Sequence, residues 1–241
     1  MPLFRVKGRL HYYAHVPKCA GSAVENYLRE RFGSLAFVNT RFYDQAEAER
    51  WTKSSPQHAA FADIQALIPG DWIASSFAVV RHPLKRLVSS FLFQAEKEGT
   101  VPEGWGIDEW VEAFLNSSRD SPFQYDNHLR PQSQLVPGGA TVFRLEEGMH
   151  QLVAHLDLLA DDRGGPREIA HVNEAKSRKD TGRNTVPSPA TLEKLVAYYA
   201  IDFRRFGYDP EGVTLTAPRA VEAAGGNGLF ARVASRLGRR A

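Results

Sequence analysis

The sequence has a single cysteine, almost no net charge and no long hydrophobic run. The lone Cys19 excludes an internal disulfide framework and a metal cluster built from several cysteines. It fits a reducing cytoplasm, with a secreted chain as the alternative. The 30 basic residues stand against 28 acidic ones, so the net charge is only +2. A charge this small predicts no nucleic acid, anionic membrane surface or strongly acidic protein as a partner. Any anion-binding site must therefore be local.

The sequence also lacks the patterns of a membrane or secreted protein. No apolar run approaches the roughly 18 residues that a membrane-spanning helix needs. Residues 1–10 contain Arg5, Lys7 and Arg9, and no apolar core of signal-peptide length follows them. We therefore expect a cytoplasmic protein without a transmembrane segment.

The composition predicts one globular domain. A chain of 241 residues with 43% hydrophobic and 24% charged residues can bury a full core. We expect this domain to span residues 1–208. Residues 209–228 contain Gly, Pro and Ala with little periodic apolar pattern, so we expect 209–241 to be a poorly ordered basic C-terminal extension.

The first motif joins a strand, a loop of small residues and a helix. Residues 10–16 are rich in aromatic side chains and favour a buried strand. Apolar residues at helical spacing follow the loop 18–22, with Ser22 as the predicted N-cap and Gly33 as the stop. The first N–H groups of a helix lack internal partners and can bind a phosphate, to which Lys18 adds a charge. Taken alone, an ordinary turn with a surface lysine explains this motif equally well.

A second motif has the same order of elements. The short apolar run at 76–80 is typical of a central parallel strand, and Pro83 then opens a helix with one apolar face. Arg81 therefore lies at the carboxyl end of a strand, where open α/β sheets bind ligands. Its guanidinium and the Ser89 hydroxyl suit a second phosphate on the same nucleotide. A salt bridge at the strand end is the alternative for Arg81, and Arg86 is expected to make a structural ion pair.

Two segments resemble known motifs of the sulfotransferases. Segment 15–22, His-Val-Pro-Lys-Cys-Ala-Gly-Ser, resembles their 5′-phosphosulfate loop, and segment 80–89, Val-Arg-His-Pro-Leu-Lys-Arg-Leu-Val-Ser, resembles their 3′-phosphate motif. The chain from about residue 10 to 208 is similar to the carbohydrate-type branch of that family, which includes the uronosyl 2-O-sulfotransferases. The resemblance implies a single α/β domain with a central parallel sheet flanked by helices, in the P-loop nucleotide-kinase-like sulfotransferase fold.

The resemblance also implies a co-substrate and the residues that contact it. The co-substrate is 3′-phosphoadenosine 5′-phosphosulfate, and no metal is expected. The nucleotide contacts are expected at Lys18, Cys19, Ala20, Gly21, Ser22, Ala23, Arg81 and Ser89.

The first motif departs from the family pattern at two positions. Cys19 stands where the family usually has Thr, and Ala23 stands where a hydroxyl residue often follows Ser22. Backbone N–H groups can still bind the phosphosulfate, because they do not depend on the side chain. A cysteine near a helix start can have a lowered pKa, but a small residue packed in a tight loop is the preferred interpretation of Cys19. In the second motif, His82 replaces a usual acidic residue.

A transfer to an alcohol needs a group that takes the hydroxyl proton. Segment 57–63 is similar to the His-x-x-Phe stretch that carries the catalytic base in the uronosyl branch. The resemblance implies that His58 is the base. Lys18 is expected to stabilise the charge that grows on the leaving phosphate oxygen, by the same logic as in phosphoryl transfer. A histidine bonded to a backbone carbonyl is an alternative of equal weight. For His11 and His15 we expect packing or supporting roles.

Later segments carry further candidates. Segment 126–133 resembles the Arg-Pro-Gln region that borders the cleft in this branch, although a structural loop is an equally good interpretation. The basic segment within 161–188 resembles a late loop that reaches the 3′-phosphate, with Ser177 and Arg178 as contacts; a solvated basic run is the alternative. Residues 141–145 predict a strand, and 191–206 predict one amphipathic helix. The expected acceptor-binding residues are His128, Arg130 and Gln132.

Together these patterns predict a sulfotransferase that moves a sulfuryl group to a hydroxyl of a carbohydrate or glycoconjugate. A nucleotide kinase of related fold should show a Gly-Lys-Ser/Thr order and an acidic Mg²⁺ ligand. A non-catalytic relative should have lost Lys18 or His58. The loop 97–106 is a candidate substrate-side loop. Four tryptophans are candidates for stacking on sugar rings, with core packing as the alternative: Trp51, Trp72, Trp105 and Trp110.

Overall fold

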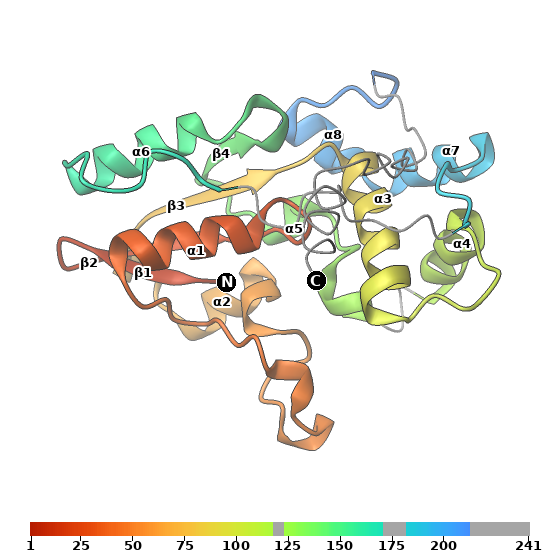
Figure 1. The fold of residues 1–241 in the computed structure, drawn as a ribbon, viewed down its shortest axis with the longest axis horizontal. Coiled ribbons are helices and arrows are strands. Elements are labelled where there is room, and N and C mark those ends of the chain that lie inside the picture. The colour runs from red at the N-terminus through yellow and green to blue at the C-terminus, as the bar shows by residue number, and fades with distance from the viewer. Residues whose placement is uncertain (118–122, 171–181, 213–241) are drawn as a thin grey trace, which may run out of the picture.

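The computed structural model describes residues 1–117, 123–170 and 182–212. Four strands form one sheet in the order β1-β2-β3-β4, with helices around it (Figure 1). The strands are β1 (Leu3–Val6), β2 (Arg9–Ala14), β3 (Ile73–Val80) and β4 (Thr141–Arg144). The helices are α1 (Gly21–Phe32), α2 (Phe61–Leu67), α3 (Pro83–Phe93), α4 (Ile107–Ser117), α5 (Gln132–Leu135), α6 (His150–Ala160), α7 (Pro189–Tyr198) and α8 (Ala200–Phe206).

The sheet is mostly parallel. Strand β2 pairs with β3 and β3 pairs with β4 in parallel, so the carboxyl ends of these three strands lie at one edge. The predicted α/β domain with a central parallel sheet is therefore confirmed. Both predicted motif strands are present, with β2 ending at Ala14 and β3 ending at Val80.

The edge strand β1 is antiparallel to β2 and was not expected. The two strands form a hairpin whose turn residues, Lys7 and Gly8, both have positive φ (50° and 77°). Such two-residue turns match the right-handed twist of the flanking strands. The basic residues Arg5, Lys7 and Arg9 of this hairpin are exposed, while Phe4 is buried.

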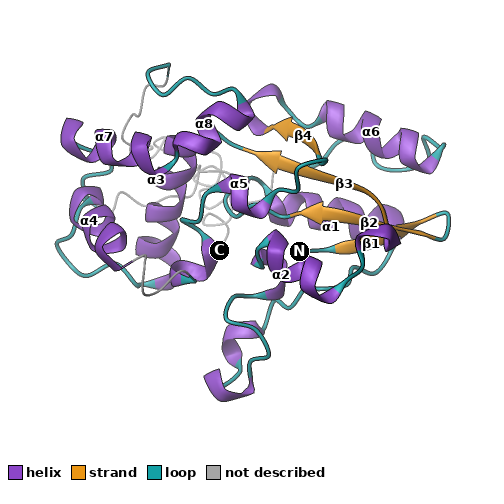
Figure 2. Ribbon diagram, turned by 180° about the vertical axis from the view of Figure 1, so that it is seen from behind, coloured by secondary structure: helices purple, strands orange, loops and turns teal. Residues whose placement is uncertain are grey.

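Among the described residues, the buried side chains form two clusters. The first surrounds the sheet and includes residues of all four strands, α1 and α6. Seen from behind, α6 lies beside β3 and β4 (Figure 2), and the His155 ring contacts the Phe143 ring at 5.4 Å between centroids. The second cluster joins α3, α4, α7 and α8, which gather beyond the carboxyl end of β3. The edge of the sheet that carries both motifs therefore lies between two packed cores.

The predicted helix over 191–206 is wrong in one respect. The chain forms α7 and α8 instead, and the break falls at Tyr199 (φ −96°, ψ 15°). The buried Tyr199 hydroxyl donates to the carbonyl oxygen of Leu129 (2.8 Å). Beyond the break, Asp202 accepts from the N–H groups of Gln132 and Ser133 at the start of α5 (2.7 and 2.8 Å). Tertiary contacts therefore override a continuous helical pattern.

In the described part of the chain, no helix has the length and apolar character needed to cross a bilayer. Most of the expected C-terminal extension, 213–241, lies outside the described residues.

Candidate active site

The loop between β2 and α1 has an unusual backbone. Lys18 and Ala20 both have left-handed φ values (66° and 62°), which are uncommon for residues other than glycine and often mark functional sites. Helix α1 begins at Gly21 with Ala20 as its N-cap, so the predicted cap at Ser22 is wrong. Because an alanine methyl cannot accept a hydrogen bond, the first N–H groups of α1 have no side-chain cap. This donor set fits a phosphate or sulfate group.

The position of His15 leaves no room for a side chain at Gly21. A Cβ atom at this position would lie 1.7 Å from Nε2 of His15, which occupies the space beside the helix start. The His15 ring is buried, and its Nδ1 lies 2.7 Å from a carboxylate oxygen of Glu25 on α1. The absence of a side chain at Gly21 therefore allows a close imidazole contact in addition to any approach by an anion.

Cys19 faces the interior of the protein. Its Sγ lies 3.7 Å from the Pro17 carbonyl oxygen and 3.6 Å from Oε1 of Gln132, and its N–H donates to the Val16 carbonyl oxygen (3.3 Å). Burial raises the pKa of the thiol to about 12, so Cys19 stays protonated at neutral pH. Both of its donors are used within the protein, which favours the packing interpretation over a nucleotide contact or a reactive thiolate.

The second motif lies directly against the first. Arg81 follows β3, and its Nη1 donates to the Lys18 carbonyl oxygen (3.4 Å). The Gln132 amide pairs with the Arg81 backbone, accepting from its N–H (3.0 Å) and donating to its carbonyl oxygen (2.8 Å). Gln132 is fully buried, so an acceptor contact there would require these bonds to break. Ser89 is buried on α3, the helix that Arg81 precedes.

Arg86 links the loop to a distant segment. It was expected to form an ion pair, but its hydrogen bonds run to backbone carbonyl oxygens: Pro17 (3.1 Å), His128 (2.8 Å) and Arg130 (2.8 Å). A guanidinium has five N–H donors, so one side chain can satisfy several carbonyls that irregular segments leave unpaired. Arg86 is completely buried and fixes the segment around His128 against the first motif.

His82 also has an interior position. It is the N-cap of α3, and its backbone N–H donates to a carboxylate oxygen of Glu146 after β4 (2.9 Å). Its Nε2 lies 3.0 Å from the Asp209 carbonyl oxygen, and its ring packs against Phe203 and Tyr208. Glu146 thus supplies a carboxylate beside the position where the family usually has an acidic residue.

Three histidine rings meet at the carboxyl edge of the sheet, and we call them the histidine cluster (His15, His58 and His128). The ring of His58 lies 4.7 Å from that of His15 and 5.2 Å from that of His128, measured between centroids. Nδ1 of His58 lies 2.6 Å from Oδ2 of Asp126. The His58 side chain is 12% exposed, so it is held in place without being fully sealed from solvent.

Lys18 reaches the same cluster from the loop. Its Nζ lies 3.9 Å from the centroid of the Phe93 ring, a cation–π contact at the end of α3. The Phe93 ring lies 5.1 Å from that of His128, which contacts His58 in turn. The predicted lysine and the predicted base are therefore linked through two aromatic rings, although 40 residues separate them in the chain.

Burial and charge set the protonation of this site. Burial lowers the pKa of His15 to about 4 and that of His128 well below its usual value, so both rings are neutral at neutral pH. Burial would raise the pKa of Asp126, but electrostatic interaction with His58 and hydrogen bonds from His58 and Ser55 hold it well below its usual value. The cluster thus contains a fixed carboxylate and two neutral imidazoles.

The remaining predicted site residues are not part of the histidine cluster. Arg130 donates to Oε1 of Gln134 (3.0 Å), and its guanidinium lies 5.4 Å from the centroid of the Phe123 ring. Ser177 and Arg178 lie outside the described residues. Trp51 (58%) and Trp72 (65%) are exposed, whereas Trp105 and Trp110 pack into the helical core.

The sequence did not assign a role to Asp126, Ser55, Phe93 or Gln94. Asp126 opens the polar segment 126–133, but nothing in that pattern links it to a histidine 68 residues earlier. A stronger structural sign is the backbone, where Tyr125, Asp126 and Asn127 all have left-handed φ values of 53°, 53° and 60°.

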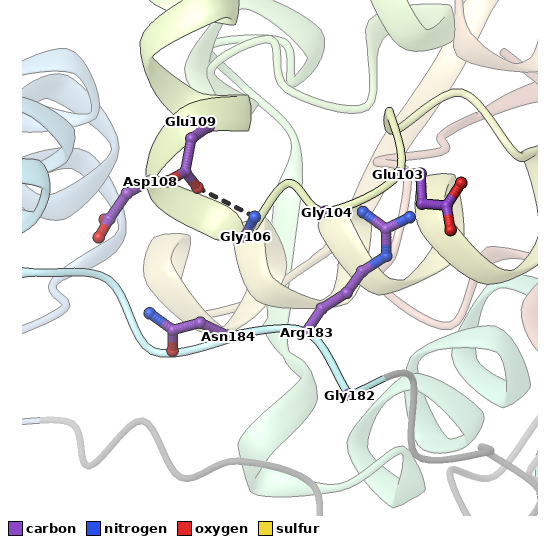
Figure 3. Close-up of a pocket in the computed structure, with 8 residues that line it drawn as sticks. All are labelled: Glu103, Gly104, Gly106, Asp108, Glu109, Gly182, Arg183 and Asn184. Atoms are coloured by element: carbon purple, nitrogen blue, oxygen red, sulfur yellow. Dashed lines mark hydrogen bonds between the residues drawn. The ribbon is translucent and has the colours of Figure 1, made fainter.

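A separate hollow lies at the start of α4 (Figure 3). It is lined by Glu103, Gly104, Gly106, Asp108, Glu109, Gly182, Arg183 and Asn184. It includes the end of the predicted substrate-side loop and none of the predicted catalytic or nucleotide-binding residues. Its three carboxylates oppose binding of a polyphosphorylated ligand.

A parallel sheet edge with two strand–loop–helix motifs rich in anion donors is typical of α/β proteins that bind phosphorylated ligands. A family model described as the sulfotransferase family matches residues 9–209. The chain therefore belongs to the sulfotransferase family. Neither the curated proteins nor the solved structures contain a significant match.

Proposed function

We propose that this protein transfers a sulfuryl group from 3′-phosphoadenosine 5′-phosphosulfate to a hydroxyl group of a carbohydrate or glycoconjugate. The observation that supports this most strongly is the series of contacts that links Lys18 to His58 through the Phe93 and His128 rings. Family membership supports sulfuryl transfer in general, and the two motifs support the choice of nucleotide.

In the proposed reaction, the acceptor oxygen attacks sulfur in line with the bond to the 5′-phosphate. An S–O bond to the acceptor forms while the S–O bond to the phosphate breaks, and the hydroxyl proton passes to Nε2 of His58. Lys18 stabilises the charge that grows on the leaving phosphate oxygen, as cations do in phosphoryl transfer. The first N–H groups of α1 and Ser22 hold the phosphosulfate, and Arg81 with Ser89 holds the 3′-phosphate.

We propose that no metal takes part. His58, Asp126 and His128 offer ligand atoms within 4.8 Å of one another, the spacing of a possible metal site. Both oxygens of Asp126, however, already accept short hydrogen bonds from Ser55 (2.6 Å each), and Oδ2 also pairs with His58. Transfer that survives a chelator would agree with this proposal, and loss restored by one added metal would oppose it.

The proposal places the reaction in the cytoplasm. The single cysteine supports this, because the protonated and buried Cys19 needs no oxidising compartment. Cell fractionation tests the placement, and recovery in a secreted or membrane fraction would contradict it.

The experiment that tests the function is a screen of hydroxylated acceptors, oligosaccharides first, with the sulfated nucleotide as donor and mass detection of added sulfate. Lys18→Ala and His58→Ala should each lower transfer by roughly 10²–10⁴-fold while the fold is retained. Lys7→Ala, in the β1–β2 turn, and His150→Ala, an exposed residue at the start of α6, are matched controls. Unchanged turnover in His58→Ala would remove that residue from the mechanism.

A further inference from the structure

We propose that Asp126 positions the base His58, and that Gln94 holds the neighbouring His128 as a neutral imidazole of the opposite tautomer. This inference rests on the proposed function, since it assigns parts to two residues that neither the family resemblance nor the motifs named. It follows from the partner that each imidazole has at Nδ1.

The partner of His58 is a carboxylate. Asp126 Oδ2 lies 2.6 Å from His58 Nδ1, and an ionised carboxylate can only accept a hydrogen bond. His58 must therefore carry its proton at Nδ1, which leaves the lone pair on Nε2 to take the proton of an acceptor hydroxyl. When Nε2 takes that proton, the Asp126 charge stabilises the imidazolium, and Asp126 itself stays ionised.

The surroundings hold this pair rigidly. Ser55 donates to Asp126 from its backbone N–H and its hydroxyl (2.6 Å each). The next residue, Asn127, donates from its side chain to the His58 carbonyl oxygen (2.8 Å). The same turn therefore fixes both the ring and the backbone of His58. Its left-handed backbone costs energy in residues other than glycine, and such strain persists only where the surroundings impose it.

The partner of His128 is an amide. Gln94 Nε2 lies 3.3 Å from His128 Nδ1, while Gln94 Oε1 accepts from the Thr100 hydroxyl (2.7 Å). An amide nitrogen is a donor only, so His128 Nδ1 must accept and Nε2 must carry the proton. His128 is buried, and the nearby cations Lys18 and Arg86 further oppose a positive charge on it.

A neutral His128 matters for the reaction. A second imidazolium with its ring 5.2 Å from His58 would repel the positive charge that His58 acquires. Gln94 and burial remove that repulsion, while the Asp126 charge favours the same step. The different Nδ1 partners therefore give the two histidines different roles: His58 can take up a positive charge, while His128 stays neutral.

The test compares Asp126→Asn with the wild-type protein. Asparagine tolerates a left-handed backbone as well as aspartate does, so the variant changes the charge and keeps the turn. Its amide can donate to Nδ1, and we expect His58 to move its proton to Nε2, which long-range ¹H–¹⁵N spectra of labelled histidine detect without any substrate. We expect kcat for transfer to fall roughly 10³-fold, with the affinity for 3′-phosphoadenosine 5′-phosphate changed less than threefold.

Two further variants complete the test. Asp157→Asn removes a carboxylate on α6 that pairs with Arg31 and Arg167, and it should leave the His58 spectrum and kcat as they are. Gln94→Glu places an acceptor beside His128, so His128 should take its proton at Nδ1, and transfer should slow by at least tenfold.

The outcomes separate this inference from the proposed function. Wild-type transfer together with an Asp126→Asn variant that keeps Nδ1–H on His58 and nearly normal kcat would overturn the positioning role alone. A His58 spectrum that changes as expected in a protein that sulfates no acceptor would support the positioning and overturn the proposed reaction. Unchanged His128 signals in Gln94→Glu would overturn the role of Gln94.

Discussion

At the scale of single residues, the missing side chain of Gly21 leaves space for the ring of His15. The residue lies in α1 and does not need a positive φ, so its backbone would accept alanine. Alanine favours a helix by up to about 1 kcal/mol over glycine. Here the added Cβ would meet the His15 ring at 1.7 Å, a contact with a buried group that has little room to move.

We predict that Gly21→Ala lowers the free energy of unfolding by about 1–3 kcal/mol, the usual cost of overpacking. The matched control is the same change in a His15→Ala background, where the ring is gone and alanine should stabilise the protein. Urea unfolding of the four proteins measures both effects. If Gly21→Ala has the same sign in both backgrounds, the close contact is not what excludes a side chain.

For single residues, the sequence indicated which side chains have suitable chemistry, but not which groups they contact. Lys18, Arg81 and His58 stand out because each has the chemistry that a sulfuryl donor or an alcohol needs. The partners of Arg86 could not be predicted, since three carbonyl oxygens from distant segments leave no pattern in the chain. The N-cap was also misplaced, because the left-handed Ala20 starts α1 earlier than the hydroxyl of Ser22 suggests.

At the scale of elements, Arg86 joins helix α3 to two irregular segments. We predict that Arg86→Lys lowers the free energy of unfolding by about 3 kcal/mol, because a single ammonium cannot replace hydrogen bonds of this geometry from a buried charge. Guanidinium chloride unfolding measures the effect. Arg41→Lys is the control, since Arg41 is 86% exposed and its change should cost under about 0.5 kcal/mol. Equal losses of unfolding free energy in the two variants would show that Arg86 contributes no more to stability than an exposed arginine does.

Apolar periodicity predicted those strands and helices whose apolar side chains are buried in the core. The runs at 10–16 and 76–80 became β2 and β3, whose last four residues are buried in the sheet. The break at Tyr199 was missed because apolar residues keep a helical spacing on both sides of it. The hairpin strand β1 was missed because it is four residues long and depends on its pairing with β2.

At the scale of the whole molecule, the fold brings together the distant segments that carry the proposed site. His58 lies in a short turn before α2, Asp126 in the connection between α4 and α5, and Lys18 after β2. Resemblance to family motifs suggests Lys18 as the lysine and His58 as the base of the proposed site. It could not propose the Asp126–His58 pair, because such a contact depends on how two irregular segments pack and not on any local pattern.

The central claim is that the edge of the sheet around Lys18 and Arg81 binds a nucleotide with a 3′-phosphate. Calorimetric titration with 3′-phosphoadenosine 5′-phosphate, against ATP with Mg²⁺, tests it most directly. We predict saturable binding of the bisphosphate, a loss of about tenfold or more in affinity for Arg81→Gln, and no comparable binding of ATP. Binding of ATP with Mg²⁺ but not of the bisphosphate would contradict the account.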